Sequence, residues 1–254
     1  MSNVKTIDID DLTERDIAKA IDHSLLRPEL DDAFIEEGCR LAAEYYVASV
    51  CVRPTDVARA KAILDGTEVA VGTTIGFPHG NHRTDTKVFE AKAALANGAT
   101  ELDMVIQIGA LKAGRDAEVL ADIAAVVQVA HAGGAIVKVI FENAYLTDDE
   151  KIRACRLSEA AQADFVKTST GFAPGGATHD DLRLMRANTS PHIGVKAAGG
   201  VRTLDALLEV MALGTTRIGA TATKAIIDDF RARKAGAAPV SAASASGGSV
   251  EGGY

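Results

Sequence analysis

The sequence contains no tryptophan, and aromatic residues make up only 4% of its 254 positions. A hydrophobic core must therefore be built mainly from Ala, Val, Ile and Leu, which the 47% hydrophobic content supplies. The chain also lacks an excess of positive charge, because its formal net charge is −8. Without a basic surface to neutralise phosphates, we expect no nucleic-acid partner.

Two further absences concern the compartment. No apolar run approaches the roughly 18 residues that a membrane-spanning helix needs, so we expect no membrane partner. The first residues, MSNVKTIDIDDLTERD, are polar and acidic and do not resemble a signal peptide. The three cysteines, Cys39, Cys51 and Cys155, are widely spaced and odd in number, which is typical of reduced thiols rather than of a disulfide framework. These features predict a cytoplasmic protein.

Short apolar runs alternate with longer segments of helical periodicity. Eight runs have the character of buried strands: 19–26, which is the least strand-like, 47–52, 68–77, 100–106, 135–142, 164–170, 192–200 and 216–221. Helical segments between them include 31–45, 85–98, 116–134, 147–162 and 203–214. Apolar strands alternating with amphipathic helices indicate a parallel sheet that is covered on its outer side. Eight such units in this length predict an α/β fold, a single (β/α)8 TIM barrel, rather than an open doubly wound sheet.

The end of the chain differs from the rest in composition. From Ala235 the sequence AGAAPVSAASASGGSVEGGY consists mostly of Ala, Gly and Ser and has no periodic apolar face. Such a segment cannot bury enough surface to order itself. We therefore expect a barrel domain over residues 1–234 and a flexible tail over 235–254, which ends in the aromatic residue Tyr254.

Charged residues occur on four consecutive predicted strands. They are Asp103 in ELDMV, Lys138 in IVKVIFE, Lys167 in FVKTST and Lys196 in GVKAAGG. Since the catalytic residues of such barrels lie at the C-terminal ends of the strands, we expect these side chains to converge in one mouth. The alternative, a solitary ion pair at the barrel rim, suits a single lysine better than lysines on three successive strands.

Paired lysines favour one kind of chemistry. A lysine amine attacks a carbonyl group only when it is uncharged, whereas its usual pKa of about 10.4 keeps it protonated. Burial and a second nearby cation both lower that pKa. A neutral amine can form a Schiff base, a carboxylate such as Asp103 can move protons, and the hydroxyls of Thr168 and Thr170 can hold a water or a substrate oxygen. These residue types predict an aldolase that needs neither a metal nor another cofactor.

Glycine-rich segments accompany the last two predicted strands. AAGGVRT follows the seventh strand, and RIGAT contains the eighth. In many barrels this region binds phosphate through backbone N–H groups, and Gly199, Gly200 and Gly219 would let the backbone approach an oxyanion closely. Arg202 would add positive charge unless it pairs with a surface carboxylate. The two segments predict a phosphate site, with ordinary turns as the alternative.

Each predicted strand also carries a recognisable motif. The motifs are DHSLLRP (22–28), CVRP (51–54), GFPHG (76–80), ELDMVI (101–106), VKVIFE (137–142), ADFVKTSTGF (163–172), GVKAAGGVRT (194–203) and RIGA (217–220). Together they resemble the deoxyribose-phosphate aldolase family, from about residue 17 to residue 230. The resemblance implies a TIM-barrel, class I aldolase that reversibly cleaves 2-deoxy-D-ribose 5-phosphate into acetaldehyde and D-glyceraldehyde 3-phosphate. It also implies a homodimer or homotetramer whose partners are phosphosugar and aldehyde substrates.

The resemblance assigns catalytic roles to particular residues. Lys167 would be the Schiff-base nucleophile, Lys196 the neighbour that keeps it uncharged, and Asp103 a proton relay. Lys138 would lie in the barrel interior and pair with Asp103 or orient a water. Some family members end in a tyrosine that assists proton transfer, and Tyr254 resembles it, although a terminal tyrosine without a function is the alternative.

The resemblance also assigns substrate contacts. Asp22 and Ser24 would face the substrate from the first strand, with Ser24 standing where a threonine is usual. The phosphate would be bound by the residues Gly171, Gly199, Gly200, Arg202, Gly219 and Thr221. The eighth strand reads GATAT where serines are common in the family, and Phe172 stands where some members carry a lysine. The second difference would weaken the preference for phosphate.

Three other interpretations remain open. A phosphosugar isomerase or epimerase would use the same barrel and phosphate loops, but such enzymes seldom need paired lysines on strands. A non-catalytic phosphosugar-binding protein would bind its ligand without turnover. His79 and His82 have the spacing of metal ligands, yet no cysteine or carboxylate cluster joins them in the sequence, so we expect ordinary loop histidines.

Overall fold

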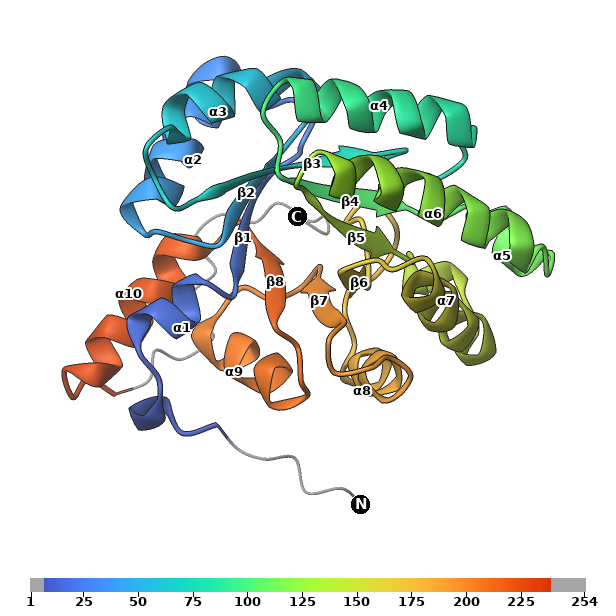
Figure 1. Cartoon of the computed structure of the whole chain (residues 1–254). Coiled ribbons are helices and arrows are strands. Elements are labelled where there is room, and N and C mark those ends of the chain that lie inside the picture. Colours follow the sequence, from blue (N-terminus) through green and yellow to red (C-terminus); the bar gives the residue numbers. More distant parts are fainter. Residues whose placement is uncertain (1–6, 239–254) are drawn as a thin grey trace.

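In the computed structural model, which describes residues 7–238, eight parallel strands close into one barrel (Figure 1). The strands are β1 (Ile21–Leu25), β2 (Ser49–Val52), β3 (Ala70–Ile75), β4 (Glu101–Val105), β5 (Ile136–Ile140), β6 (Phe165–Lys167), β7 (Gly194–Ala198) and β8 (Arg217–Ala220). Each strand pairs with its neighbour in the chain, and β1 pairs with β8 to close the ring. The TIM-barrel prediction is confirmed, and all eight predicted strands form.

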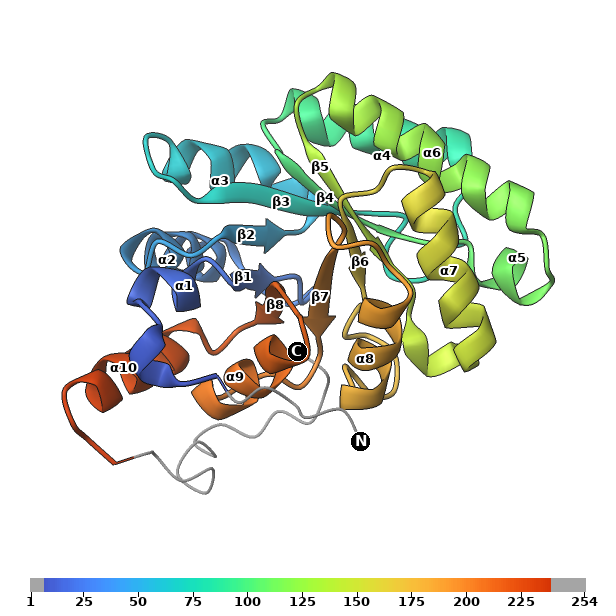
Figure 2. The ribbon, with the colours of Figure 1, turned by 60° about the horizontal axis from the view of Figure 1, so that its bottom comes forward.

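Helices cover the outside of the barrel, as Figures 1 and 2 show. They are α1 (Glu14–Ala18), α2 (Asp32–Glu44), α3 (Val57–Leu64), α4 (Thr84–Ala96), α5 (Ile108–Lys112), α6 (Asp116–Ala132), α7 (Asp148–Ala160), α8 (His179–Ala187), α9 (Leu204–Ala212) and α10 (Thr223–Lys234). The five predicted helical segments correspond to α2, α4, α6, α7 and α9. The helices that the structure describes are all too short or too polar to span a bilayer.

Local sequence signals explain where several helices begin. The side chain of Thr147 accepts a hydrogen bond from the backbone N–H of Glu150, and the Glu150 carboxylate accepts one from the Thr147 N–H. This reciprocal cap satisfies two backbone donors that would otherwise have no partner at the start of α7. Thr203 caps α9 through the N–H of Ala206 in a similar way.

Strand residues alternate between an apolar outer layer and a polar interior. On β4, Leu102 and Met104 belong to the hydrophobic core between strands and helices, whereas Asp103 meets lysines across the barrel. Because successive side chains of a strand point to opposite faces, one polar residue between two apolar ones projects into the barrel. The same alternation explains why the polar run around Asp22 and Ser24 still forms a strand, since both residues lie in the polar interior.

The predicted division into a barrel over 1–234 and a tail over 235–254 stays a prediction. The last helix, α10, ends at Lys234, where the barrel domain was expected to end. Most of the predicted tail, including Tyr254, lies outside the described residues.

Candidate active site

Asp103 stands at the centre of the charged residues inside the barrel. The side-chain nitrogens of Lys167 and Lys196 each lie 2.8 Å from the same oxygen, Oδ2 of Asp103. Lys138 Nζ donates to the other oxygen, Oδ1, at 2.9 Å. All four side chains are buried. The four strand residues that were expected to converge therefore do so, because β4, β5, β6 and β7 are neighbours in the barrel.

A second layer of charges lies next to this group. Lys196 Nζ is 2.6 Å from Asp22 Oδ2, and Arg217 also contacts Asp22. Arg217 reaches Glu101 at 3.1 Å, and Glu101 accepts a hydrogen bond from Lys138. Glu101 and Arg217 were not anticipated from the sequence. Each stands two residues before an interior position already singled out on its strand, so the period of two would have pointed to both.

We call these seven residues the charge cluster, which contains four cations and three carboxylates. The cations are Lys138, Lys167, Lys196 and Arg217, and the carboxylates are Asp22, Glu101 and Asp103. If every group were ionised, one positive charge would be in excess in a nearly dry interior. An uncompensated buried charge is costly, and the loss of one lysine proton removes it. The cluster as a whole thus favours one uncharged amine.

The pKa shifts within the cluster follow from the same contacts. Burial opposes ionisation of Asp103, but the neighbouring lysines Lys138, Lys167 and Lys196 outweigh it and hold the pKa of that carboxyl well below its usual range. The pKa of Asp22 is lowered in the same way, with Lys138, Lys196 and Arg217 outweighing the effect of burial. Burial alone would lower the pKa of Lys138, yet three carboxylates raise it well above its usual value. Asp103 and Asp22 are therefore carboxylates near neutral pH, and Lys138 is an ammonium.

Cys51 lies on β2 beside the charge cluster. Burial, assisted by the negative charge of Asp103, raises the pKa of its thiol to about 11. A thiol of this kind is uncharged near pH 7 and is a poor nucleophile.

Within residues 7–238, no three His, Cys, Asp or Glu side chains are arranged to hold a metal ion.

The two threonines after β6 are engaged with protein groups. Thr168 Oγ1 donates to the carbonyl of Ala198 at 3.2 Å and accepts from its N–H at 3.1 Å, which joins the end of β6 to β7. The Thr170 hydroxyl donates to Glu142, and the Thr170 N–H lies 3.2 Å from the same carboxylate. Both hydroxyls were predicted to hold a water or a substrate oxygen. In this structure they hold the loop in place.

Glu142 is a residue that sequence reasoning passed over. It follows β5, is buried, and has a left-handed backbone with φ of 56°. This conformation is strained for any residue with a side chain, and it aims the carboxylate at Thr170. Its place at the end of the VKVIFE motif, where a strand meets the mouth, was the available signal. The hydrogen bond to a residue 28 positions away was not visible in the sequence.

Four of the predicted phosphate residues lie on the two adjacent loops after β6 and β7. Gly199 and Gly200 follow β7 with φ of 80° and 101°, values that favour glycine. A Cβ atom on Gly199 would stand 2.9 Å from the Cα of Gly176, so the loops after β6 and β7 meet backbone to backbone. Gly171 is buried in the first of these loops, and Arg202 is exposed after the second.

The remaining substrate residues lie on β1 and β8. Gly219 is buried in β8, and a Cβ atom there would be 3.7 Å from both Ser24 Oγ and Lys196 Cε. Ser24 is buried, and its hydroxyl has no hydrogen-bond partner among the residues of 7–238. Thr221 is exposed just after β8. Of the predicted site residues, Tyr254 lies outside the described part of the chain.

Comparison with known proteins decides the family. Residues 16–238 match the model of the DeoC/LacD family aldolases. The chain belongs to this family. A relative named deoxyribose-phosphate aldolase from a Geobacillus species is 52% identical over 215 residues, which cover 85% of this chain and 96% of the relative. A second, deoxyribose-phosphate aldolase 2 of Bacillus licheniformis, is 54% identical over 211 residues, which cover 83% of this chain and 94% of that one.

Solved structures agree with this assignment. A putative deoxyribose-phosphate aldolase from Coccidioides immitis superposes with a TM-score of 0.83 at 43% identity, and the match covers 87% of each chain. A tetrameric deoxyribose phosphate aldolase from Aeropyrum pernix gives a TM-score of 0.82 at 28% identity, covering 89% of this chain and 95% of that one. Family and fold thus identify this DeoC/LacD member as a TIM-barrel aldolase, a carbon–carbon lyase.

Proposed function

We propose that the protein reversibly cleaves 2-deoxy-D-ribose 5-phosphate into acetaldehyde and D-glyceraldehyde 3-phosphate through a Schiff base on Lys167. One observation carries the choice of nucleophile: Lys167 and Lys196 lie at 2.8 Å from one oxygen of the buried Asp103. Two lysine amines on one carboxylate oxygen disfavour each other's charge, and Lys167 is the one that stands in the VKTST motif to which the aldolase resemblance assigns the nucleophile.

The uncharged amine of Lys167 attacks the aldehyde carbon C1 of the open-chain sugar, and loss of water gives an imine. The protonated imine accepts electrons, so the C2–C3 bond breaks with its electron pair moving to C2. The C3 hydroxyl loses its proton to become the carbonyl of D-glyceraldehyde 3-phosphate. Protonation of the resulting enamine at C2, followed by hydrolysis, releases acetaldehyde and the free amine.

Asp103 accepts protons in this scheme, either directly or through a water. Its low pKa means that it does not carry a proton of its own in the free protein. Lys196 stays beside it as the cation that disfavours a second charge on Lys167, and Lys138 fixes the opposite oxygen of Asp103. Asp22 and Ser24 face the bound sugar from β1.

The phosphate is assigned to the loops after β6 and β7 and to the end of β8. Backbone N–H groups at Gly171, Gly199, Gly200 and Gly219 would bind its oxygens, because glycine permits a close approach of the backbone. Two further side chains are assigned to the same group, those of Arg202 and Thr221. An isomerase or epimerase would use such loops as well, but the paired lysines favour the aldolase.

The proposal also covers the oligomeric state of the protein, its cellular compartment and the role of its C-terminal residues. The relative from Aeropyrum pernix is a tetramer, which supports a homodimer or homotetramer for this chain. The reduced cysteines and the phosphosugar substrate support a cytoplasmic location.

Tyr254 is assigned to proton transfer at the acetaldehyde methyl group. Removal of this residue should slow proton exchange at that methyl group several-fold, with little change in the affinity for the sugar.

Imine trapping tests the proposal. Borohydride added in the presence of acetaldehyde should attach a two-carbon unit to Lys167, which peptide mass spectrometry would locate. The cleavage of 2-deoxy-D-ribose 5-phosphate should proceed equally with and without EDTA. An adduct on another lysine, or none at all, would contradict the assignment of the nucleophile. Full activity of a Lys167→Leu variant would favour the isomerase instead.

A further inference from the structure

The N-terminal end of the barrel carries its own layer of interior side chains. Glu101 is the first residue of β4, Phe165 of β6 and Arg217 of β8. Glu101 and Phe165 stand two positions before Asp103 and Lys167, so all four side chains lie on the inner faces of their strands. The interior of a TIM barrel is filled in layers, each built from alternate strands. We call Glu101, Phe165 and Arg217 the floor layer.

Arg217 crosses the barrel within the floor layer. Its strand, β8, lies opposite β4 in the closed ring of eight strands, yet Nη2 of Arg217 donates to Glu101 at 3.1 Å. Nη1 donates to Asp22 on β1, and the guanidinium lies 5.6 Å from the centre of the Phe165 ring. Gly194 on β7 leaves room for that ring, because a Cβ atom there would collide with it. Only 15% of the Arg217 side chain is exposed, so its charge is largely removed from water.

Arg217 contacts two of the three carboxylates of the charge cluster, Asp22 and Glu101. Each of these carboxylates also faces a lysine. Asp22 lies 2.6 Å from Lys196, and Glu101 accepts a hydrogen bond from Lys138. The charge of an arginine on a carboxylate reduces the stabilisation that the same carboxylate gives to a lysine ammonium. The floor layer therefore weakens the support for positive charge on the lysines above it.

The guanidinium of Arg217 differs from the lysine amines in that it does not give up its proton in proteins. Burial opposes its charge, but Asp22 and Glu101 outweigh burial and raise its pKa above the usual value. A buried lysine, by contrast, can lose its proton in the ordinary pH range. The positive charge in excess in the cluster must therefore be removed at a lysine, because Arg217 keeps its own.

The charged and titratable groups of the interior around Lys167 come from five strands. They are Asp22 of β1, Cys51 of β2, Asp103 of β4, Lys138 of β5 and Lys196 of β7. The charge of Arg217 also acts outside the barrel. Burial, Arg15 and Arg217 together lower the pKa of Lys19 on α1, although Glu68 lies 3.7 Å from its nitrogen. Lys19 has this carboxylate of its own, and Cys51 is uncharged, so neither alters the balance of the cluster.

We propose that Arg217, held across the barrel floor by Glu101, is a positioning residue that keeps Lys167 uncharged for its attack on the substrate. The inference rests on the proposed aldolase function and assigns the residue that fixes the charge balance of the same site. Arg217 acts through Asp22 and Glu101, which it partly neutralises. Without Arg217, three lysines face three carboxylates, and every lysine can keep its proton.

The test measures kcat/KM for cleavage of 2-deoxy-D-ribose 5-phosphate between pH 5 and 10. Activity needs the neutral amine, so the acid limb of the profile marks the loss of the Lys167 proton. Arg217→Met removes the excess charge and should move this limb to higher pH by about one to two units. Glu101→Gln leaves four cations and two carboxylates, which should move the limb to lower pH. Glu101→Gln/Arg217→Met leaves three and two, so its limb should return to within about half a unit of wild type.

Arg233→Met is the matched control. The Arg233 side chain on α10 is 10% exposed and also pairs with two carboxylates, Asp205 and Asp229, but it lies outside the charge cluster. Its acid limb should coincide with that of wild type. Thermal denaturation of each variant verifies folding, and Glu101→Gln decides the matter by itself if Arg217→Met does not fold.

The outcomes separate this inference from the proposed function. Wild-type protein that fails to cleave 2-deoxy-D-ribose 5-phosphate would contradict the proposed function itself. With normal wild-type cleavage, an acid limb that stays in place in Glu101→Gln would overturn the role of the floor layer. A loss of activity in Arg217→Met that is equal at every pH, or a double variant that keeps the shift of Arg217→Met, would overturn it as well, because Arg217 would then serve the fold alone.

Discussion

Two buried lysine sites in this barrel differ in how their charge is balanced. Lys87 on α4 donates to Asp122 on α6 and to the carbonyl of Val105, outside the barrel. Lys167 lies inside, in a cluster where four cations share three carboxylates. Both side chains are almost completely buried. Burial alone therefore does not distinguish the lysine proposed as nucleophile from the structural one, whereas the ratio of cations to carboxylates around them does.

Removal of Lys167 should give the largest effect on activity. We expect Lys167→Met to lower kcat/KM for sugar cleavage on the order of 10⁴-fold or more, because the proposed nucleophile is lost. The same change leaves three cations and three carboxylates, so the melting temperature should stay the same or rise. Steady-state kinetics and thermal denaturation measure the two quantities. A large loss of stability would mean that the charge of Lys167 balances the cluster rather than exceeding it.

Removal of Lys87 should have the opposite pattern. Lys87→Met leaves the buried Asp122 without its cation, which typically costs about 3–5 kcal/mol of unfolding free energy. Activity per folded molecule should change little, because Lys87 does not touch the charge cluster. Urea denaturation measures the unfolding free energy, and an assay at low temperature measures the activity per folded molecule. Loss of turnover without loss of stability would remove the contrast between the two lysines.

Glu142 offers a buried carboxylate that is held by hydrogen bonds from Thr170 instead of by lysines. Glu142→Ala should loosen the loop that carries Gly171. We expect KM for 2-deoxy-D-ribose 5-phosphate to rise about tenfold, with a smaller change in kcat. The corresponding KM for unphosphorylated 2-deoxy-D-ribose should change less. Equal effects on both sugars would show that Glu142 does not act through the phosphate loops.

Acid pH should reveal the lowered pKa of Asp103. A carboxyl whose folded-state pKa is depressed stabilises the fold above its unfolded pKa of about 3.9, and this contribution is lost as the pH falls further. The difference in stability between wild type and Asp103→Asn should thus be constant above about pH 5 and shrink below pH 4. For one group the slope is at most about 1.4 kcal/mol per pH unit. Thermal melts between pH 2.5 and 6 measure it, and a difference that grows on acidification would refute this assignment.

The sequence predicted those parts of the molecule that depend on strand order and alternation. Asp103, Lys138, Lys167 and Lys196 converge because they occupy interior positions on four neighbouring strands. The resemblance to aldolases concerned the same positions. Even the polar first strand could be placed, since a barrel interior accepts polar residues at every second position.

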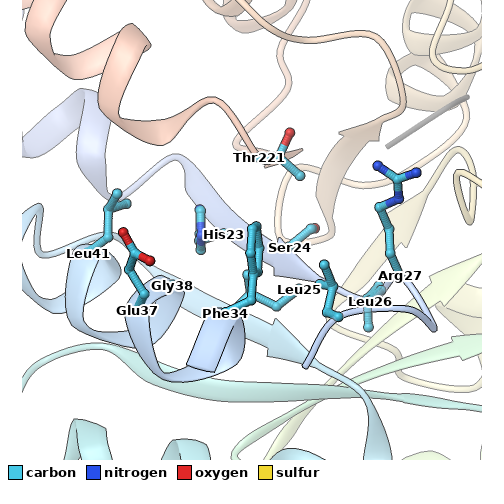
Figure 3. A pocket seen from close by; sticks show the side chains of 11 residues that line it. His23, Ser24, Leu25, Leu26, Arg27, Phe34, Glu37, Gly38, Leu41 and Thr221 are labelled. Atoms are coloured by element: carbon cyan, nitrogen blue, oxygen red, sulfur yellow. The ribbon is translucent and has the colours of Figure 1, made fainter. Parts of the chain in front are cut away.

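Other features depend on contacts that no local pattern records. Glu142 reaches Thr170 only because its backbone is left-handed, and neither residue signals this in the sequence. The hydrogen bonds between Thr168 and Ala198 depend on how the chain just after β6 approaches the end of β7. A cavity lined by residues of β1 and α2 lies near the point where the β1–β8 pairing ends (Figure 3). Periodicity does not fix such distances.

The central claim is that the unequal charge balance leaves Lys167 uncharged in the free protein. Nitrogen-15 NMR of lysine side chains measures this directly, with the Lys167 signal assigned through its absence in Lys167→Met and the Lys87 signal through Lys87→Met. At pH 7.5 the Lys167 nitrogen should have the chemical shift of a neutral amine, while Lys87 should have that of an ammonium. An ammonium shift for Lys167 under these conditions would contradict the account.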